Sequence, residues 1–206
     1  MDYSTKRLEA LADGIFAIAM TILVVTLDIP HLSAGVSIAD ASTFLLGQAH
    51  KIMNYFLSFV LLAIFWLQHH QHSHITEKTD NVHLWINMFI LMFISLIPFS
   101  TSLVSTFTYD RVDEALFGLN IFVIGLLFYA SLYYAGSRGC LSKTRPVTEK
   151  TLSNLKYNAM ITPAVASIGI FFAVLTPYYS PYVYLLIPAL VMLNSIKKRR
   201  SIDKQS

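Results

Sequence analysis

The chain has 206 residues, of which 55% are hydrophobic and only 13% are charged. A soluble domain usually carries about 25% charged residues, so this chain has too little polar surface for a soluble globular enzyme. It is also too apolar to be disordered. Its one cysteine, Cys140, excludes an intrachain disulfide and a paired-cysteine metal site. The composition therefore predicts a membrane protein that crosses the bilayer several times.

Stretches free of Asp, Glu, Lys and Arg predict where the chain crosses the membrane, because a spanning helix needs about 20 mostly apolar residues. The uncharged run at 157–196 is long enough for two helices, and the proline-flanked segment at 176–181 predicts the turn between them. We therefore predict an all-α fold with six transmembrane helices, at residues 8–29, 45–70, 82–106, 114–136, 157–176 and 180–197. Residues 1–197 are expected to form one domain, followed by a short basic tail at 198–206.

The basic residues predict how the chain is oriented. With six spans, thirteen of the fifteen Lys and Arg residues fall on the side of the two termini, and the exceptions are Lys51 and Arg111. The positive-inside rule then places both termini in the cytoplasm. Asp110, Asp113 and Glu114 fall on the opposite, outer side.

The first helix is unusual because it is short. Its 14 uncharged residues between Asp13 and Asp28 cover about 21 Å, less than the ~30 Å hydrocarbon core of a bilayer. A helix over 8–29 takes Asp13 into the membrane, where a carboxylate normally faces protein or water. We therefore expect this helix to lie at the centre of the assembly, shielded from lipid, with Asp13 as a buried acid.

A helical wheel at 100° per residue divides this helix into three surfaces. Asp13 lies on the back of the helix. Small residues form a second face that permits close helix packing. The third surface is an apolar stripe. On periodicity alone, ordinary packing in a bundle explains the pattern, and a pore-lining stripe is the alternative. The small face is Ala10, Gly14, Ala17 and Thr21, and the stripe is Leu11, Ile18, Ile22, Val25 and Ile29.

The segment from Arg7 to Thr21 resembles the first-helix motif of the transmembrane protein 175 family of potassium channels, which has shorter bacterial and archaeal members. That motif reads Arg-x-x-x-Phe-Ser-Asp, and Arg7 and Asp13 match it, whereas Leu11 and Ala12 replace the Phe and Ser. The Phe65-to-His70 segment resembles the family's Trp-x-x-His-His, and the stretch from Asn87 to Phe99 resembles its third helix.

The resemblance implies a homotetramer of six-helix subunits in which the first helices line a central pore. It implies a moderately selective potassium channel in the plasma membrane of a prokaryote. The expected partners are K⁺, lipid and other copies of the chain, and neither a cofactor nor a nucleic acid is expected. The family's constriction is an apolar residue five positions after the motif Asp, which is Ile18 here. Further rings would follow at Ile22 and Val25, with Thr21 as a hydroxyl contact.

The sequence contains no Thr-Val-Gly-Tyr-Gly motif, so a carbonyl filter is not expected. An apolar neck would instead favour K⁺, which loses its water more easily than Na⁺. The resemblance also implies a polar network that holds the first helix at its cytoplasmic end. Its members would be Arg7, Asp13, Trp66, His69, His70 and Asn87.

Two other functions, transport and metal-dependent oxidation, are alternatives to a channel. A secondary transporter is an alternative, although the halves of the chain show no repeat. A membrane di-iron oxygenase would need several histidine boxes, and this chain has one cluster, at His69, His70, His72 and His74. A peripheral zinc site or a pH-sensing patch is also open for that cluster.

Overall fold

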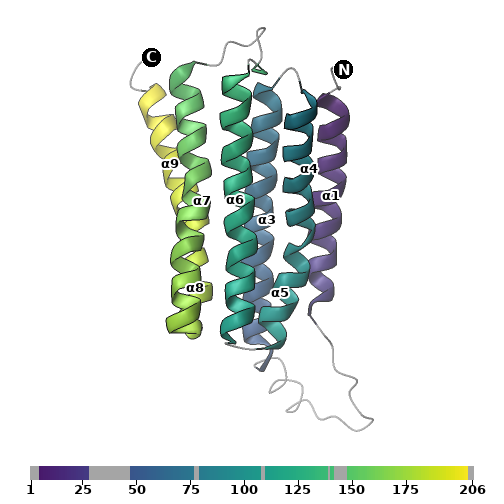
Figure 1. Cartoon of the computed structure of the whole chain (residues 1–206). Helices are drawn as coiled ribbons and strands as arrows, with labels where there is room; N and C mark the ends of the chain where they lie inside the picture. The colour runs from purple at the N-terminus through teal and green to yellow at the C-terminus, as the bar shows by residue number, and fades with distance from the viewer. Residues whose placement is uncertain are drawn as a thin grey trace.

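Long helices run side by side along a common direction (Figure 1). The computed structural model describes residues 5–27, 47–76, 79–107, 110–138, 140–141 and 148–203. In chain order, the helices are α1 (Thr5–Val25), α3 (Ala49–Ile75), α4 (Asn81–Ser95), α5 (Ile97–Thr106), α6 (Arg111–Ser137), α7 (Glu149–Leu175), the 3₁₀ turn η1 (Pro177–Tyr179), α8 (Ser180–Tyr184) and α9 (Leu186–Asp203).

Five of the predicted spans are long and apolar enough to cross a membrane, with α4 and α5 acting together as one. The break between these two helices lies at Leu96, two residues before Pro98, whose nitrogen has no proton to donate within the helix. α9 is the sixth helix. Because Lys197, Lys198, Arg199, Arg200 and Asp203 are part of it, its apolar portion is shorter than the others. The predicted basic tail therefore begins inside α9.

The predicted bounds of the first helix were wrong at both ends. α1 begins at Thr5 and ends at Val25, instead of covering 8–29. The N–H groups of Thr26 and Leu27 donate to carbonyls three residues back, those of Leu23 and Val24, so the chain tightens into a turn there. Ile29, the last residue of the predicted apolar stripe, lies outside the described residues.

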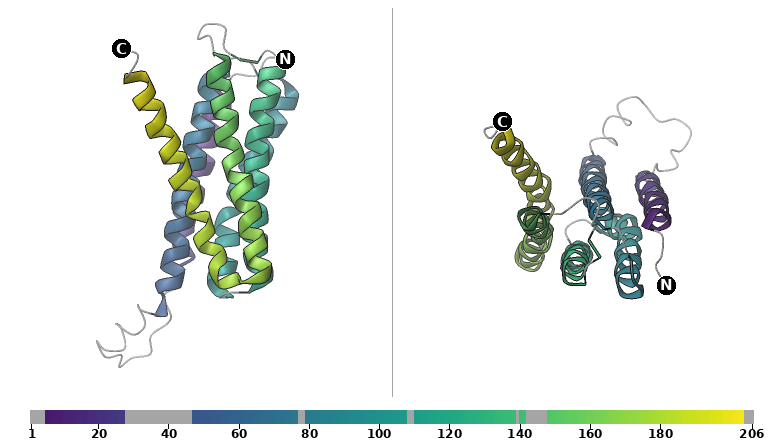
Figure 2. Two further views of the ribbon diagram at one scale, coloured as in Figure 1. Left: turned by 90° about the vertical axis from the view of Figure 1, so that its left-hand side faces the viewer. Right: turned by 90° about the horizontal axis from the view of Figure 1, so that it is seen from above.

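The helices form a bundle with α1 at one edge and α9 at the other (Figure 2). α1 packs against α3, α4 and α5, while α6 and α7 form the most extensive helix pair. α1 begins and α9 ends at one end of the bundle, which we call the terminal end. α3 and α6 begin at the other end, where α8 also lies, and we call this the distal end.

The crossing of α6 and α7 depends on a glycine. A Cβ atom added to Gly125 would lie 2.5 Å from Pro163 Cδ and 2.8 Å from Pro163 N, both on α7. Pro163 lies inside α7, and its backbone nitrogen cannot move aside without moving the helix. Gly125 therefore permits the close approach of these two helices.

We expect Gly125→Ala to lower the free energy of unfolding by about 1–3 kcal/mol, the usual cost of overpacking. The better helix propensity of alanine offsets part of this loss. Gly136→Ala on the same helix is the control, because its nearest neighbour is a flexible leucine methyl group, Leu152 Cδ2 at 3.0 Å. Thermal unfolding in detergent measures both changes, and equal effects at the two glycines would contradict the packing argument.

Candidate pore-lining helix and its polar contacts

One side of α1 is buried in its own subunit and the other side is open. Leu8, Ala12, Phe16, Ala19 and Leu23 are 8% exposed or less and pack into the core. They follow one another at intervals of three or four residues and so share one face of the helix. α1 is therefore held through this face, and its remaining surface is free for contacts outside the subunit.

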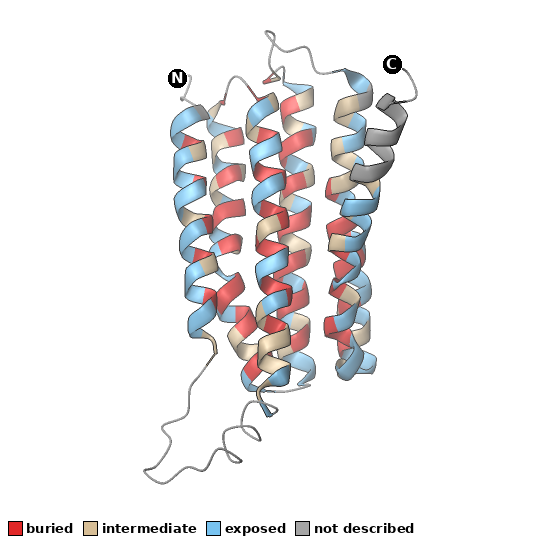
Figure 3. Ribbon diagram, turned by 180° about the vertical axis from the view of Figure 1, so that it is seen from behind, coloured by how far each residue is buried: buried red, intermediate tan, exposed pale blue. Residues whose placement is uncertain are grey.

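The predicted pore stripe lies on the open side of α1. Ile18 is 59% exposed, Ile22 50% and Val25 71% in the single chain. Seen from behind, much of α1 is coloured as exposed along its length (Figure 3). The stripe is thus uncovered by its own subunit, as a surface on a central axis would be.

The small residues of α1 do not pack within the single subunit. Ala10, Gly14 and Ala17 are exposed, and a Cβ atom on Gly14 would meet nothing within 4 Å. Within the chain, close packing is provided by the face that contains Ala12 and Phe16 instead. The small face is therefore open toward whatever surrounds the subunit.

Thr21 lies at the edge of the stripe. Its hydroxyl donates a hydrogen bond to the Ile18 carbonyl at 2.8 Å. The proton is thereby directed to the backbone, while the lone pairs of the exposed oxygen remain available. Thr21 can act as an acceptor next to the Ile18 position.

Asp13 is joined to α3. Its Oδ1 accepts a hydrogen bond of 2.9 Å from Trp66 Nε1, in the part of α3 that lies beside it. The prediction of a buried acid was wrong for the single chain, because the Asp13 side chain is exposed. A charge-assisted hydrogen bond therefore fixes the back of α1 to its neighbour.

A second contact between these helices was not predicted. His70 Nδ1 lies 3.2 Å from Glu9 Oε1, and the His70 ring stacks on Trp66 at a centroid distance of 5.9 Å. Glu9 precedes Asp13 by four residues, so the two carboxyl groups lie one turn apart. That spacing was the signal in the sequence that could have identified Glu9.

The contacts of Glu9 and Asp13 on α1 with His70 and Trp66 on α3 form an exposed ladder between the two helices. The other predicted network members lie apart from this ladder. His69 is buried, its ring is 6.0 Å from that of Phe16, and its side chain interacts with Asn87. The amide nitrogen of Asn87 donates to the His83 carbonyl at 2.8 Å. Among the described residues, exposed Arg7 has no hydrogen bond or ion pair. The predicted network is therefore an exposed ladder and a separate buried group, without Arg7.

The terminal end carries one further polar contact. Asp80, the N-cap of α4, accepts hydrogen bonds from the Tyr134 hydroxyl at 2.6 Å and from the His83 N–H at 2.8 Å. These bonds hold the pKa of the Asp80 carboxyl below its usual value, with the Tyr134 hydroxyl as the largest cause. Asp80 thus ties the start of α4 to the last turns of α6.

The four histidines of the cluster on α3 lie in two different environments. His69 and His72 are buried, whereas His70 and His74 are exposed, with their rings nearly parallel and 6.4 Å apart. In the described part of the chain, no three His, Cys, Asp or Glu side chains are grouped so that they could hold a metal ion. The four histidines therefore do not form one ligand set.

The hydrogen bond from Trp66 to Asp13 can be removed while an aromatic side chain is kept at position 66. We expect Trp66→Phe to lower the free energy of unfolding by about 1 kcal/mol, a typical net value for one hydrogen bond. Trp85→Phe, at an exposed tryptophan, controls for the loss of ring size. A double-mutant cycle with Asp13→Ala isolates the pair, and a coupling energy near zero would contradict the contact.

Comparisons with known proteins agree with this arrangement. The family described as "Endosomal/lysosomal potassium channel TMEM175" matches residues 7–98, which cover nearly all of α1, all of α3 and α4, and the first two residues of α5. A potassium channel of Chryseobacterium sp. (strain P1-3) is 26% identical over 198 residues, which are 96% of this chain and 95% of that protein. The zebrafish (Danio rerio) endosomal/lysosomal proton channel TMEM175 is 25% identical over 124 residues, 60% of this chain and 24% of that protein.

The fold is also that of a solved channel. The crystal structure of a lysosomal potassium-selective channel TMEM175 homolog from Chamaesiphon minutus matches with a TM-score of 0.78. The two share 20% identity, and the match covers 94% of this chain and 97% of the other. The chain is thus similar to the TMEM175 family over the helix that carries the motif, and its fold is similar to that of a TMEM175 homolog.

Proposed function

We propose that four copies of this chain form a potassium channel whose central pore is lined by α1. The observation that carries the proposal is the open apolar stripe: Ile18, Ile22 and Val25 are exposed on the one helix that bears the family motif. Homo-oligomers close by rotational symmetry, so one such stripe from each of four subunits would surround a common axis.

The small face of α1 favours a neighbouring helix over lipid. Ala10, Gly14 and Ala17 leave the backbone of α1 accessible on the side next to the stripe. Membrane helices approach one another closely at such faces, whereas large side chains fill a surface that faces lipid. The small face would thus receive the neighbouring subunit, and the stripe would then face the axis.

The chemistry of the neck follows from its side chains. A ring of four Ile18 side chains offers no oxygen to a cation, so an ion must pass by shedding or squeezing its water. K⁺ holds its hydration shell less tightly than Na⁺ and would pass more easily, which gives moderate selectivity. A narrow apolar constriction can also close by dewetting. Thr21, one turn from Ile18, would supply a hydroxyl acceptor.

Orientation completes the proposal. α1 begins and α9 ends at the terminal end of the bundle, as an even number of spans requires (Figure 1). The excess of Lys and Arg on that side would place it in the cytoplasm, with the channel in the plasma membrane. The contacts between α1 and α3 at Glu9, Asp13, Trp66 and His70 would then lie near the cytoplasmic entrance of the pore.

Electrical recording of the purified protein in a planar bilayer tests this function. We expect unitary currents in KCl and a reversal potential that favours K⁺ when Na⁺ replaces it on one side. A transporter would instead give saturable, coupled flux without unitary steps, and that outcome would contradict the channel.

A further inference from the structure

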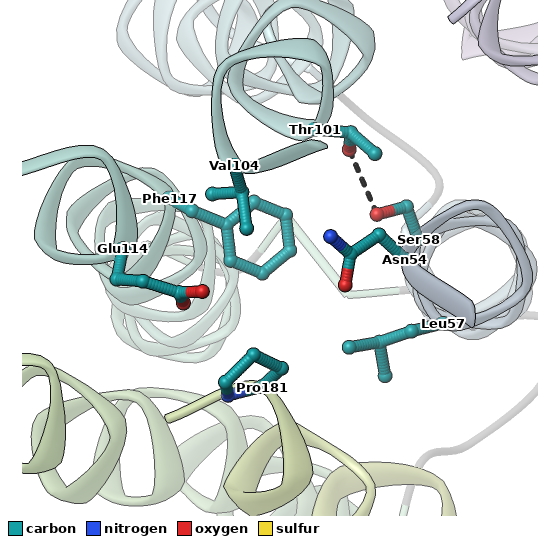
Figure 4. Close-up of a pocket in the computed structure, with 8 residues that line it drawn as sticks. All are labelled: Asn54, Leu57, Ser58, Thr101, Val104, Glu114, Phe117 and Pro181. Atoms are coloured by element: carbon teal, nitrogen blue, oxygen red, sulfur yellow. Dashed lines mark hydrogen bonds between the residues drawn. The ribbon is translucent and has the colours of Figure 1, made fainter. Parts of the chain in front are cut away.

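A buried acid lies at the distal end of the bundle, away from α1. Glu114 occupies the first turn of α6, and its carboxyl group points into the interior (Figure 4). The sequence grouped it with Asp110 and Asp113 as an outer surface charge, but Glu114 is only 1% exposed. Asp110 is exposed and Asp113 is half-buried, so the adjacent acids differ sharply in environment.

The Glu114 carboxyl group has no close hydrogen-bond partner in the described part of the chain, because the Ser180 hydroxyl that interacts with it donates its proton to the Gly169 carbonyl at 3.1 Å. Neither Oε1 nor Oε2 has a hydrogen-bond partner, although both atoms are fully covered. No Lys, Arg or His side chain among the described residues forms an ion pair with it. A buried carboxylate without a counter-charge is strongly disfavoured, so this position calls for a neutralising positive charge.

The surrounding pocket is small, and its polar groups are already engaged. The Thr101 hydroxyl donates to Ser58 Oγ at 2.7 Å, and Asn54 Nδ2 lies 3.1 Å from His50 Nε2. The cavity measures about 10 Å³, roughly the space of one water molecule. Four helices line it, with Asn54, Leu57 and Ser58 from α3, Thr101 and Val104 from α5, Glu114 and Phe117 from α6, and Pro181 from α8.

Few titratable groups face this carboxyl. Asp113 on its own helix is a like charge. α8 contributes Tyr184, whose buried hydroxyl also has no partner among the described residues. α3 contributes His50, whose Nε2 lies 3.1 Å from Asn54 Nδ2 and 3.4 Å from the Val104 carbonyl oxygen. α5 presents Thr101 and Val104, neither of which titrates. None of these described groups forms an ion pair with Glu114.

A proton fits this position better than a metal cation. Hard cations need several oxygen ligands at once, whereas the Thr101 and Ser58 hydroxyls here bond to each other and the Asn54 amide group bonds to His50. A proton neutralises the carboxylate on one of its own oxygens and needs no extra volume. We propose that Glu114 is a proton-binding site that is occupied at neutral pH, and that proton release loosens the contact between α8 and the start of α6, where Tyr184 packs on Phe117 at a ring-centroid distance of 5.2 Å.

The consequence is a distal end that responds to alkaline pH. Ionised Glu114 would have to draw in water, and Pro181, at the start of α8, is the side chain that closes the pocket from that side. The helix α8 leads directly into α9, so loosening it would disturb the start of the last helix of the bundle. This property is independent of how ions pass along α1.

Infrared spectroscopy of the purified full-length protein tests the proton directly. The matched variants are Glu114→Gln, which keeps the size of the side chain without a titratable proton, and Asp113→Asn at the adjacent acid. At neutral pH we expect a carboxylic-acid C=O band in wild type and in Asp113→Asn that is missing in Glu114→Gln. Absence of the band in wild type, or its persistence in Glu114→Gln, overturns the proposal.

A pH and salt series on thermal unfolding tests the consequence. Wild type and Asp113→Asn should lose several degrees of melting temperature between pH 6 and pH 9 relative to Glu114→Gln, because only they carry an acid that must ionise in a dry site. Equal pH dependence in all three proteins contradicts this. Stabilisation of wild type by Na⁺ at fixed pH, absent in Glu114→Gln, would assign the site to a metal cation instead. If Glu114→Gln does not fold, the pH titration of the infrared band in Asp113→Asn decides the matter alone.

Discussion

Replacing Ile18 by asparagine is expected to reduce the K⁺/Na⁺ permeability ratio by several-fold and to raise the Na⁺ current. Four amide groups at the neck would offer oxygens to a passing ion and would keep the constriction wet. The penalty for dehydration, which we propose as the source of selectivity, would then fall for both ions, and it would fall more for Na⁺. The ratio follows from reversal potentials in reconstituted bilayers with K⁺ and Na⁺ on opposite sides.

Val24→Asn is the matched control for this change. Val24 lies on α1 close to Ile22 in sequence and is equally exposed, at 50%, but it falls outside the stripe by about 120°. It adds the same polar group to the same helix, so its selectivity should stay close to wild type. Unchanged selectivity in Ile18→Asn would rule out Ile18 as the filter, and equal changes in both variants would mean that the effect is not local.

Removing the Phe16 ring should give the largest loss of stability on α1. Phe16 is 1% exposed and lies in the core beside His69. Truncation of a buried phenylalanine to alanine costs about 3–5 kcal/mol, because the apolar transfer energy is lost and a cavity remains. Since α1 is held to the bundle mainly through this face, we expect Phe16→Ala to lower the melting temperature and to reduce channel activity together.

Two further variants separate packing from other effects of the Phe16 change. Phe16→Leu keeps most of the apolar volume and should cost less than about 1.5 kcal/mol. Val24→Ala truncates an exposed side chain of the same helix and should have a small effect. Thermal unfolding in detergent compares all three. A loss in Phe16→Ala no larger than that in Val24→Ala would contradict the assigned packing face.

The number and type of spans could be predicted from the sequence because charge spacing in a membrane chain is a strong signal. Asp, Glu, Lys and Arg are costly inside the bilayer, so the gaps between them mark the helices. The ends of α1 could not be predicted in this way, since Thr26 and Leu27 are uncharged, as a helix interior would be, yet their N–H groups close a turn. Helix ends depend on local backbone bonds that composition does not reveal.

The faces of α1 show a second limit of sequence reasoning. Periodicity separated Ile18, Ile22 and Val25 from the rest of the helix, but it could not say which face its own subunit covers. The buried face turned out to include Ala12 and Phe16, which the helical wheel had not singled out. Pairs between helices, such as Asp13 with Trp66 and Glu9 with His70, require the tertiary structure, because they join residues far apart in the chain.

Glu114 illustrates the same point for charge. Its neighbours in sequence are Asp113 and Ala115, and nothing in that segment distinguishes a surface acid from a buried one. Its burial follows from the contact of α8 with the start of α6, where Tyr184 packs on Phe117 and Pro181 lines the same pocket as Glu114, and this contact depends on how Ser180–Tyr184 folds after the proline-flanked turn. Tyr184 is fully buried for the same reason.

The central claim is that the open stripe of α1 lines the ion path, and cysteine substitution tests it most directly. Cys140 is the only native cysteine and is buried, so Cys140→Ser provides the background. In that background, Ile18→Cys, Ile22→Cys and Val25→Cys should each make the K⁺ current sensitive to block by Cd²⁺, because four thiols would surround the axis. Val24→Cys should remain insensitive. Block at Val24→Cys with no block at the three stripe positions would contradict the account.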